Sequence, residues 1–191
     1  GCCPDGGGAV RVEGSRASLS ARHTTLHSSR ANGLVVLQGA SANLQHCTVS
    51  DNGRHGVSGR GNGSKIEAIH THIDGNQESN IAITGAAHAS LKHVTCNSSR
   101  RGSGWSVTGL PGSSSMKVLH SEARGNWLHG ACASAGVSLV LVHSHCTDNG
   151  GCGWHAHGSD TIITPESSES GGNGKGNIAE KEIGRASCRE R

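Results

Sequence analysis

The chain has 191 residues, which is enough for one domain of ordinary size. It contains 30 Gly and 3 Trp but no Phe or Tyr, and only 32% of its residues are hydrophobic, which excludes a core built on aromatic side chains. The net charge of +3 is too small to favour nucleic acid as a partner, and no run of about 18 apolar residues predicts a membrane-spanning helix.

Both ends of the chain differ from its middle. Residues 1–16 are rich in glycine, and we expect them to form an irregular start; they lack a Met and the basic-then-apolar pattern of a signal peptide. Residues 182–191, "EIGRASCRER", resemble a translated sequencing adapter, so we treat them as a non-native tail. We therefore expect the chain to be a fragment of a longer protein.

Residues 17–181 repeat with a period of about 24 residues, in two independent patterns. The pattern Gly/Asn–apolar–x–apolar–x–Gly begins at Gly33, Gly56, Asn80, Gly104, Gly130, Gly153 and Asn177. The pattern apolar–x–His–x–x–apolar places its histidines at His23, His46, His70, His93, His120 and His143. Four residues before most starts stands an asparagine, namely Asn52, Asn76, Asn126, Asn149 or Asn173, with Ser29 and Arg100 as exceptions.

A unit of this length with short alternating strands cannot bury a face alone, but stacked copies can pair strand on strand at about 4.8 Å. We therefore predict an all-β solenoid of about seven coils. The repeat resembles the right-handed, single-stranded parallel β-helix of the pectate-lyase-like superfamily. That superfamily includes polysaccharide lyases, hydrolases and epimerases, and the fold also occurs as a repeat module in some F-box proteins. The resemblance implies a fold rather than one activity.

The histidine column allows two interpretations. The histidines are expected to form a ladder at a corner of the coils, with each ring stacking on or hydrogen-bonding to the next. The alternative is a metal-binding or pH-sensing column. In either case, charging neighbours about 5 Å apart should disfavour protonation and weaken the fold below the ordinary histidine pKa of about 6.5.

The stretch "HSHCTDNGGCGWHAH", residues 143–157, is the densest in potential metal ligands. Strand alternation turns Trp154 and Ala156 inwards and His155 and His157 outwards, and the repeat puts Cys132 beside His155. Cys132, His155 and His157 are thus a predicted site for Zn²⁺ or Cu²⁺, completed by water. The alternative is two exposed histidines on a sheet face. No other cofactor is predicted.

The residues do not favour catalysis. The absence of Tyr removes the epimerase pattern that the resemblance implies, and Asp51 and Asp74 are the only carboxylates expected on neighbouring coils. As turn residues, they are expected to bond backbone amides. Trp105 and Trp154 fall at core positions, which leaves Trp127 as the one tryptophan expected to be exposed.

The sequence therefore predicts a non-catalytic module for binding or scaffolding, which contacts a protein or glycan partner through a flat Ser/Thr strand face and a His-rich edge. Neither nucleic acid nor a membrane is an expected partner, and the module is expected to be monomeric as part of its longer chain. The alternative is a fragment of a polysaccharide-modifying enzyme whose catalytic coils lie outside it. The compartment stays open, because reduced thiols favour an intracellular setting whereas the sequons at Asn62 and Asn97 favour secretion.

Overall fold

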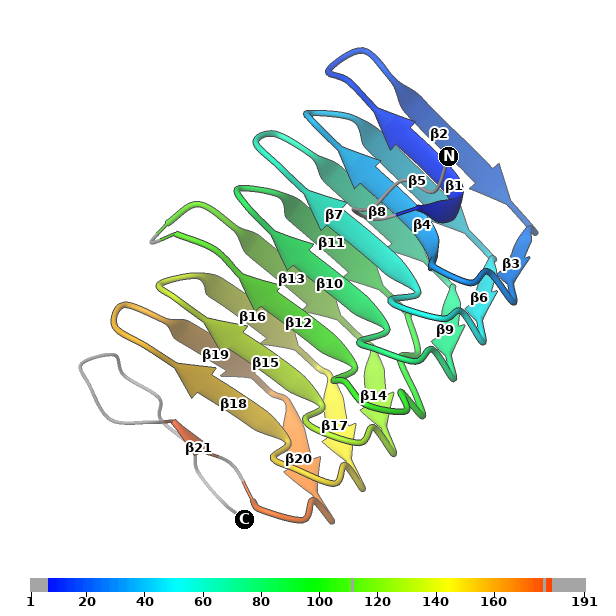
Figure 1. Cartoon of the computed structure of the whole chain (residues 1–191). Helices are drawn as coiled ribbons and strands as arrows, with labels where there is room; N and C mark the ends of the chain where they lie inside the picture. The colour runs from blue at the N-terminus through cyan, green and yellow to red at the C-terminus, as the bar shows by residue number, and fades with distance from the viewer. Residues whose placement is uncertain (1–6, 111, 177, 180–191) are drawn as a thin grey trace.

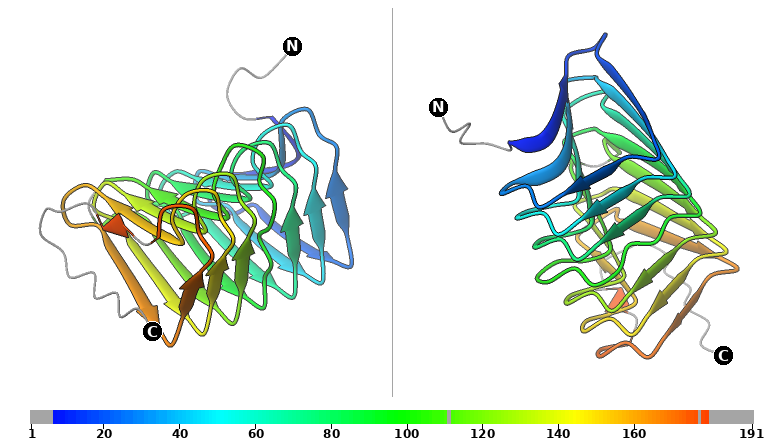
Figure 2. Two further views of the ribbon diagram at one scale, coloured as in Figure 1. Left: turned by 90° about the horizontal axis from the view of Figure 1, so that it is seen from below. Right: turned by 90° about the vertical axis from the view of Figure 1, so that its right-hand side faces the viewer.

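The computed structural model describes residues 7–110, 112–176 and 178–179. Within these ranges the chain forms 21 strands and no helix. The strands build a parallel solenoid of about seven coils, with each coil stacked on the next along one axis (Figures 1 and 2). The predicted all-β solenoid is confirmed.

Each coil contributes strands to three sides of the solenoid. The first sheet consists of β1 (Gly8–Glu13), β4 (Asn32–Leu37), β7 (Val57–Arg60), β10 (Ile81–Thr84), β12 (Trp105–Thr108), β15 (Ala131–Ser134), β18 (Trp154–His157) and β21 (Ile178–Ala179). The second sheet consists of β2 (Ser18–Arg22), β5 (Ser41–Gln45), β8 (Lys65–Ile69), β11 (His88–Lys92), β13 (Ser115–Leu119), β16 (Ser138–Val142) and β19 (Ile162–Glu166).

The third side is made of short strands and is interrupted. It holds β3 (Thr25–His27), β6 (Thr48–Ser50) and β9 (His72–Asp74), and then β14 (Glu122–Arg124), β17 (His145–Thr147) and β20 (Glu169–Gly171). Between the two groups Thr95 forms only isolated bridges, to His72 and to Glu122. The coil that contains Thr95 therefore continues the side without a full strand.

Period-2 alternation fills the core with small aliphatic side chains. In β16, Leu139 and Leu141 are fully buried while the residues between them are partly exposed. Trp105 and Trp154 are buried among the aliphatic residues, as predicted. Because the space between the sheets is narrow, a core with almost no aromatic residues still packs without large side chains.

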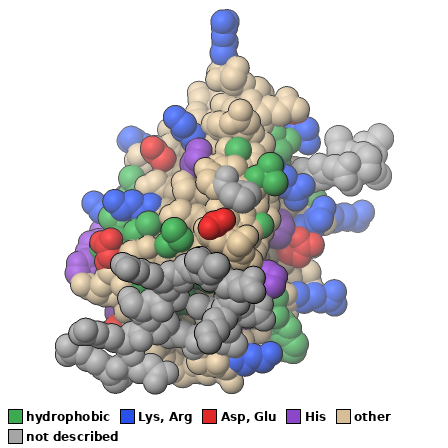
Figure 3. All heavy atoms as spheres, turned by 90° about the vertical axis from the view of Figure 1, so that its left-hand side faces the viewer, with side chains coloured by type: hydrophobic (Ala, Val, Ile, Leu, Met, Phe, Trp, Pro, Cys, Tyr) green, Lys and Arg blue, Asp and Glu red, His purple; other side chains and the backbone are tan. Residues whose placement is uncertain are grey.

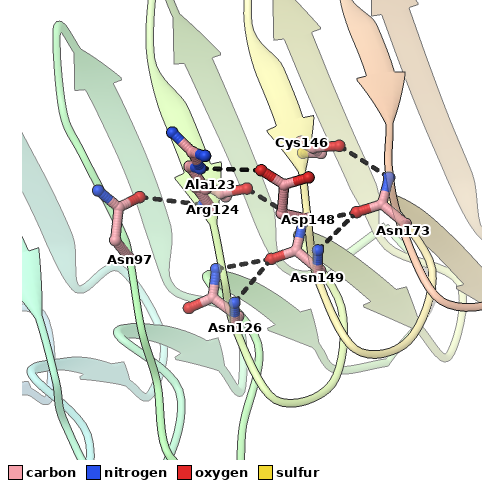
Figure 4. A network of polar contacts seen from close by, with 8 residues as sticks. All are labelled: Asn97, Ala123, Arg124, Asn126, Cys146, Asp148, Asn149 and Asn173. Atoms are coloured by element: carbon pink, nitrogen blue, oxygen red, sulfur yellow. Dashed lines mark hydrogen bonds and ion pairs between the residues drawn. The ribbon is translucent and has the colours of Figure 1, made fainter.

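A ladder of buried asparagines stabilises the turn that precedes the first sheet (Figure 4). Asn126 donates from Nδ2 to Oδ1 of Asn149, and Asn149 donates in the same way to Asn173, both at 2.9 Å. The backbone N–H of Asn126 also donates to Asn149 Oδ1 at 2.9 Å. Each amide thus satisfies buried groups of the neighbouring coil, which fixes the register between coils.

One predicted member of this column is displaced by a residue. Ser99, and not Arg100, donates its backbone N–H to Asn126 Oδ1 at 3.0 Å, so Ser99 occupies the ladder position. Asn80 replaces the missing side chain, because it accepts from Asn76 at 2.8 Å and donates to Asn126 Oδ1 at 3.2 Å. The ladder therefore stays connected across a coil that lacks an asparagine at this position.

The solenoid begins before the predicted boundary at Ala17. Gly8–Glu13, which lies in the segment expected to be irregular, forms β1 and pairs in parallel with β4. Residues 182–191, the predicted adapter-derived tail, lie outside the described residues.

The surface carries charges of both signs. On the face drawn in Figure 3, basic and acidic side chains are interspersed among polar ones, and ion pairs such as Arg124–Asp148 at 2.9 Å join neighbouring coils. No helix in the described part of the chain is long and apolar enough to cross a membrane. The thiols of Cys47, Cys96, Cys132 and Cys146 are free, and three of them are buried.

Candidate functional site

The predicted histidine ladder forms along one corner of the solenoid. His23, His46, His70, His93, His120 and His143 stack in sequence, with ring centroids 4.7–5.3 Å apart and ring planes within 18° of parallel. All six residues are exposed. The predicted stacking of the rings is thereby confirmed.

Each ladder histidine turns the chain from the second sheet into the third side. The six residues have φ between 46° and 53°, a left-handed conformation in which histidine is enriched among the non-glycine residues. In this conformation the backbone N–H of His93 donates to the carbonyl of Leu119 on the next coil at 3.0 Å. The recurring turn therefore places one imidazole per coil at the same position.

A groove runs beside the ladder, across three successive coils. Its lining residues are His93, Val94, Thr95, His120, Ser121, Glu122, His143 and His145. Three ladder imidazoles line the groove, one from each coil, together with Thr95, Glu122 and His145 of the third side.

One ladder imidazole in the groove has a shifted pKa. The pKa of His93 lies below its ordinary value, because of desolvation and then the positive potential of His70, His120 and Lys92. A neutral imidazole offers one hydrogen-bond donor and one acceptor.

The structure brings together two of the three predicted metal ligands. Cys132 and His155 are register partners on β15 and β18, as predicted from the repeat. His157 pairs in register with Ser134 and is exposed, and its ring centroid lies 6.3 Å from that of His155. His157 does not belong to the group of potential ligands that surrounds His155.

His129 and Cys152, which the strand pattern did not single out, complete that group. The ligand atoms of His129, Cys152 and His155 all lie within 4.8 Å of one another. The rings of His129 and His155 stack with centroids 4.4 Å apart, and Nδ1 of His129 accepts the backbone N–H of Cys152 at 3.0 Å. Burial, followed by His155 and Lys175, lowers the pKa of His129 to about 4.

The outer face of the first sheet is less open than predicted. Ser58 and Ala82, which point outwards by strand alternation, are both buried. Arg60 lies over Ser58 and donates from Nε to its Oγ at 3.1 Å. Small side chains on a flat sheet are covered by longer neighbours, so this end of the face offers little accessible surface.

The carboxylates expected to be neighbours have structural partners. Asp74 accepts the backbone N–H of Asn97 at 3.0 Å, and Asp51 pairs with Arg100 at 3.0 Å. The pKa of Asp74 is raised, chiefly by burial and also by the charges of Asp51 and Glu122. Asp74 therefore bonds a backbone amide, as predicted for a turn residue, and lies in a locally acidic environment.

Trp127 has an exposed fraction of 67%, and Leu128 beside it has one of 43%. Both lie in the turn between β14 and β15, directly before His129. The prediction that Trp127 is exposed while Trp105 and Trp154 are buried is confirmed.

Comparison with known proteins gives one family. The family model described as "Right handed beta helix region" matches residues 8–168, which is most of the chain. No curated protein and no solved structure matches.

Proposed function

The chain belongs to the right-handed β-helix family, and we propose that it is a non-catalytic module that binds a protein or glycan partner along the histidine-lined groove. The observation that carries the proposal is the groove itself, which crosses three coils and is lined by one ladder imidazole from each of them. A groove of this kind suits an extended partner that lies parallel to the solenoid axis.

The chemistry of the walls supports a polar partner with hydrogen-bond donors and acceptors. The ring nitrogens of His93, His120 and His143 can donate or accept, and the carboxylate of Glu122 accepts. Hydroxyl-rich glycan chains and extended peptide backbones both carry such groups in regular succession. The groove contains no tryptophan among its lining residues, so binding there rests on hydrogen bonds more than on ring stacking.

The proposal is tested by binding to an array of neutral and acidic oligosaccharides, and by photo-crosslinking from a reactive group placed at position 145. The double variant Glu122→Gln/His145→Gln removes the carboxylate of Glu122 and the imidazole ring of His145 from the lining of the groove. We expect it to lose about tenfold or more in affinity, corresponding to ~1.4 kcal/mol.

His88→Gln is the matched control. His88 is an exposed histidine on β11, outside the groove, and contacts Ser115 Oγ at 2.9 Å. It should leave binding unchanged, and a crosslinker at position 88 should capture nothing. Binding that is equal in the double variant and the control, for glycan and protein alike, contradicts the proposal.

The second candidate is part of a polysaccharide-modifying enzyme with further catalytic coils outside this chain. The raised pKa of Asp74 beside Asp51 and Glu122 favours it, since perturbed carboxylates are common at catalytic sites. The test is release of reducing ends or unsaturated products from polysaccharides, in the wild type and in Asp74→Asn. Product release that Asp74→Asn abolishes while the strand content is retained would favour the enzyme over the binding module.

A further inference from the structure

Two successive coils carry the same pair of residue types in exchanged order. The first coil reads His129–x–x–Cys132, and the next reads Cys152–x–x–His155. In both coils the first residue stands immediately before the start of the repeat pattern, at Gly130 or Gly153, and the second stands two residues after it. A histidine and a cysteine therefore face each other across the coil boundary at two neighbouring positions.

The strand pairing places these four residues on one patch. Cys132 and His155 are register partners. Just before them, Gly130 N–H donates to the carbonyl of Cys152 at 3.0 Å, and Cys152 N–H donates to Nδ1 of His129 at 3.0 Å. His129 therefore lies against Cys152 in the same way as Cys132 lies against His155.

The side chains converge as well as the backbone. The ligand atoms of His129, Cys152 and His155 lie within 4.8 Å of one another. Cys132 stands outside that group of three, and its place in the site rests on its strand register, because it is the Cα partner of His155 on the neighbouring coil. Cys152 is fully buried and the other three are partly buried, so the group lies at a protected corner and not on an open strand face.

Two thiols and two imidazoles are the ligand set of a tetrahedral zinc site, in which each short segment contributes one pair of ligands. We propose that His129, Cys132, Cys152 and His155 bind one Zn²⁺ ion that joins the two coils. The site is separate from the histidine-lined groove, and the inference does not depend on the proposed function.

Two further observations support it. Nδ1 of His129 presents a lone pair that can serve a metal as well as a hydrogen bond. That lone pair, on Nδ1, already faces Cys152, and zinc binding exchanges the hydrogen bond from Cys152 N–H for a coordinate bond. Gly151 also leaves room for the ring, because a Cβ at this position would lie 2.8 Å from His129 Nδ1.

His157 belonged to the ligand set expected from strand alternation. In the proposed site His129 and Cys152 take its place. Its ring centroid is 6.3 Å from that of His155, and it stands beside Ser134 at the far end of β18 from Cys152. The two ligand sets share Cys132 and His155, so variants of His129, Cys152 and His157 distinguish them.

The test uses Co²⁺ as a spectroscopic probe, titrated into the full chain after chelation and reduction. Cys2, Cys3 and Cys188, which lie outside the described residues, are replaced by serine throughout, so that they cannot contribute thiolates. We expect one equivalent of Co²⁺ to give thiolate-to-metal charge-transfer bands and the strong visible bands of tetrahedral cobalt, and Zn²⁺ to displace it. Zinc should also raise the midpoint of thermal unfolding.

Each of the variants His129→Gln, Cys132→Ser, Cys152→Ser and His155→Gln should weaken Co²⁺ binding by about 100-fold or more, since even partners that do not touch a metal are worth 10–100-fold. His157→Gln is the control and should bind as the parent does. Circular dichroism checks the strand content of every variant. Cys132→Ser, at a partly exposed position, keeps the test decisive if Cys152→Ser does not fold.

Three results would overturn the assignment. The first is the absence of charge-transfer bands in the parent chain. The second is full binding by the folded variants Cys132→Ser and His129→Gln. The third is loss of binding in His157→Gln with no change in His129→Gln, which would establish the site on the strand face in its place.

Discussion

His70 and His93, one coil apart, stack with ring centroids 4.7 Å apart and ring planes 5° from parallel, the closest pair in the ladder. Both rings are exposed, so their contact with water moderates the repulsion that would follow from charging them together. The ladder thus links the stability of the solenoid to the protonation of its histidines.

We expect the protein to lose stability as the pH falls from about 7.5 to about 5.5. The folded-state pKa is lowered for His93 and His55, and to about 4 for His129, in each case first by desolvation. Below the unfolded pKa of about 6.5 the unfolded chain therefore binds more protons than the folded one, and the free energy of unfolding declines towards pH 4. Above pH 6.5 this contribution is constant.

The measurement is the midpoint of thermal unfolding at the two pH values. His129→Asn removes an imidazole whose pKa is lowered to about 4 and should reduce the pH-dependent loss, as should His93→Asn, since asparagine tolerates the left-handed backbone. Equal midpoints at both pH values in the parent chain would mean that the ring stack has no energetic link to protonation.

Asn126→Ala should destabilise the fold by about 3 kcal/mol or more. Asn126 is buried and bonds Asn149, the carbonyl of Cys96 and the N–H of Ser99. Truncation leaves these groups buried without partners, at about 1–3 kcal/mol each. Urea unfolding measures the change. The control Asn62→Ala, at an exposed turn position, should stay within about 0.5 kcal/mol, and an equal loss in both variants would argue against the ladder.

Leu91→Ala should cost about 2–5 kcal/mol, because Leu91 is fully buried between the sheets and its loss leaves a cavity. Leu110→Ala is the matched control, since Leu110 has an exposed fraction of 77%, and it should change stability by less than about 0.5 kcal/mol. Chemical denaturation of both variants is the check. A change of less than about 1 kcal/mol in Leu91→Ala would indicate a loosely packed core.

Gly102→Ala should destabilise by about 1–3 kcal/mol, since a Cβ there would overlap the backbone nitrogen of Ser79 and lie 2.6 Å from the carbonyl carbon of Glu78. Those atoms belong to the preceding coil and cannot move without opening the stack. Gly171→Ala, where nothing lies within 4 Å, is the control. Thermal unfolding should separate the two variants, and identical midpoints would show that the coils adjust at little cost.

The periodicity of the sequence predicted the ladders well, because a solenoid pairs equivalent residues of successive coils. The asparagine column failed at one position. The coil that separates His93 from His120 is longer than the others, so counting back four residues from Gly104 reached Arg100 where Ser99 is the equivalent residue. The hydrogen bond from Asn80 to Asn126, which connects the ladder across this coil, could not be predicted from the repeat, because it joins two positions that are not equivalent in the repeat.

The candidate metal ligands illustrate the same limit. The register of the repeat correctly paired Cys132 with His155, because both lie inside regular strands. His129 and Cys152 stand in the turn before the strands, where alternation gives no direction for a side chain. The exchanged order His–x–x–Cys and Cys–x–x–His at equivalent positions was the available signal.

The sequence by itself determined the period, the stacking of the coils and the identity of the stacked columns, because hydrogen bonding in a parallel solenoid aligns each residue with its copy one period away. Only the tertiary structure decided the groove beside the ladder, the burial of Ser58 and Ala82, and the meeting of His129 with Cys152 and His155. These features arise at turns or where a long side chain lies over a small one. The direction of a side chain there depends on backbone and side-chain dihedral angles, which a repeat pattern does not contain.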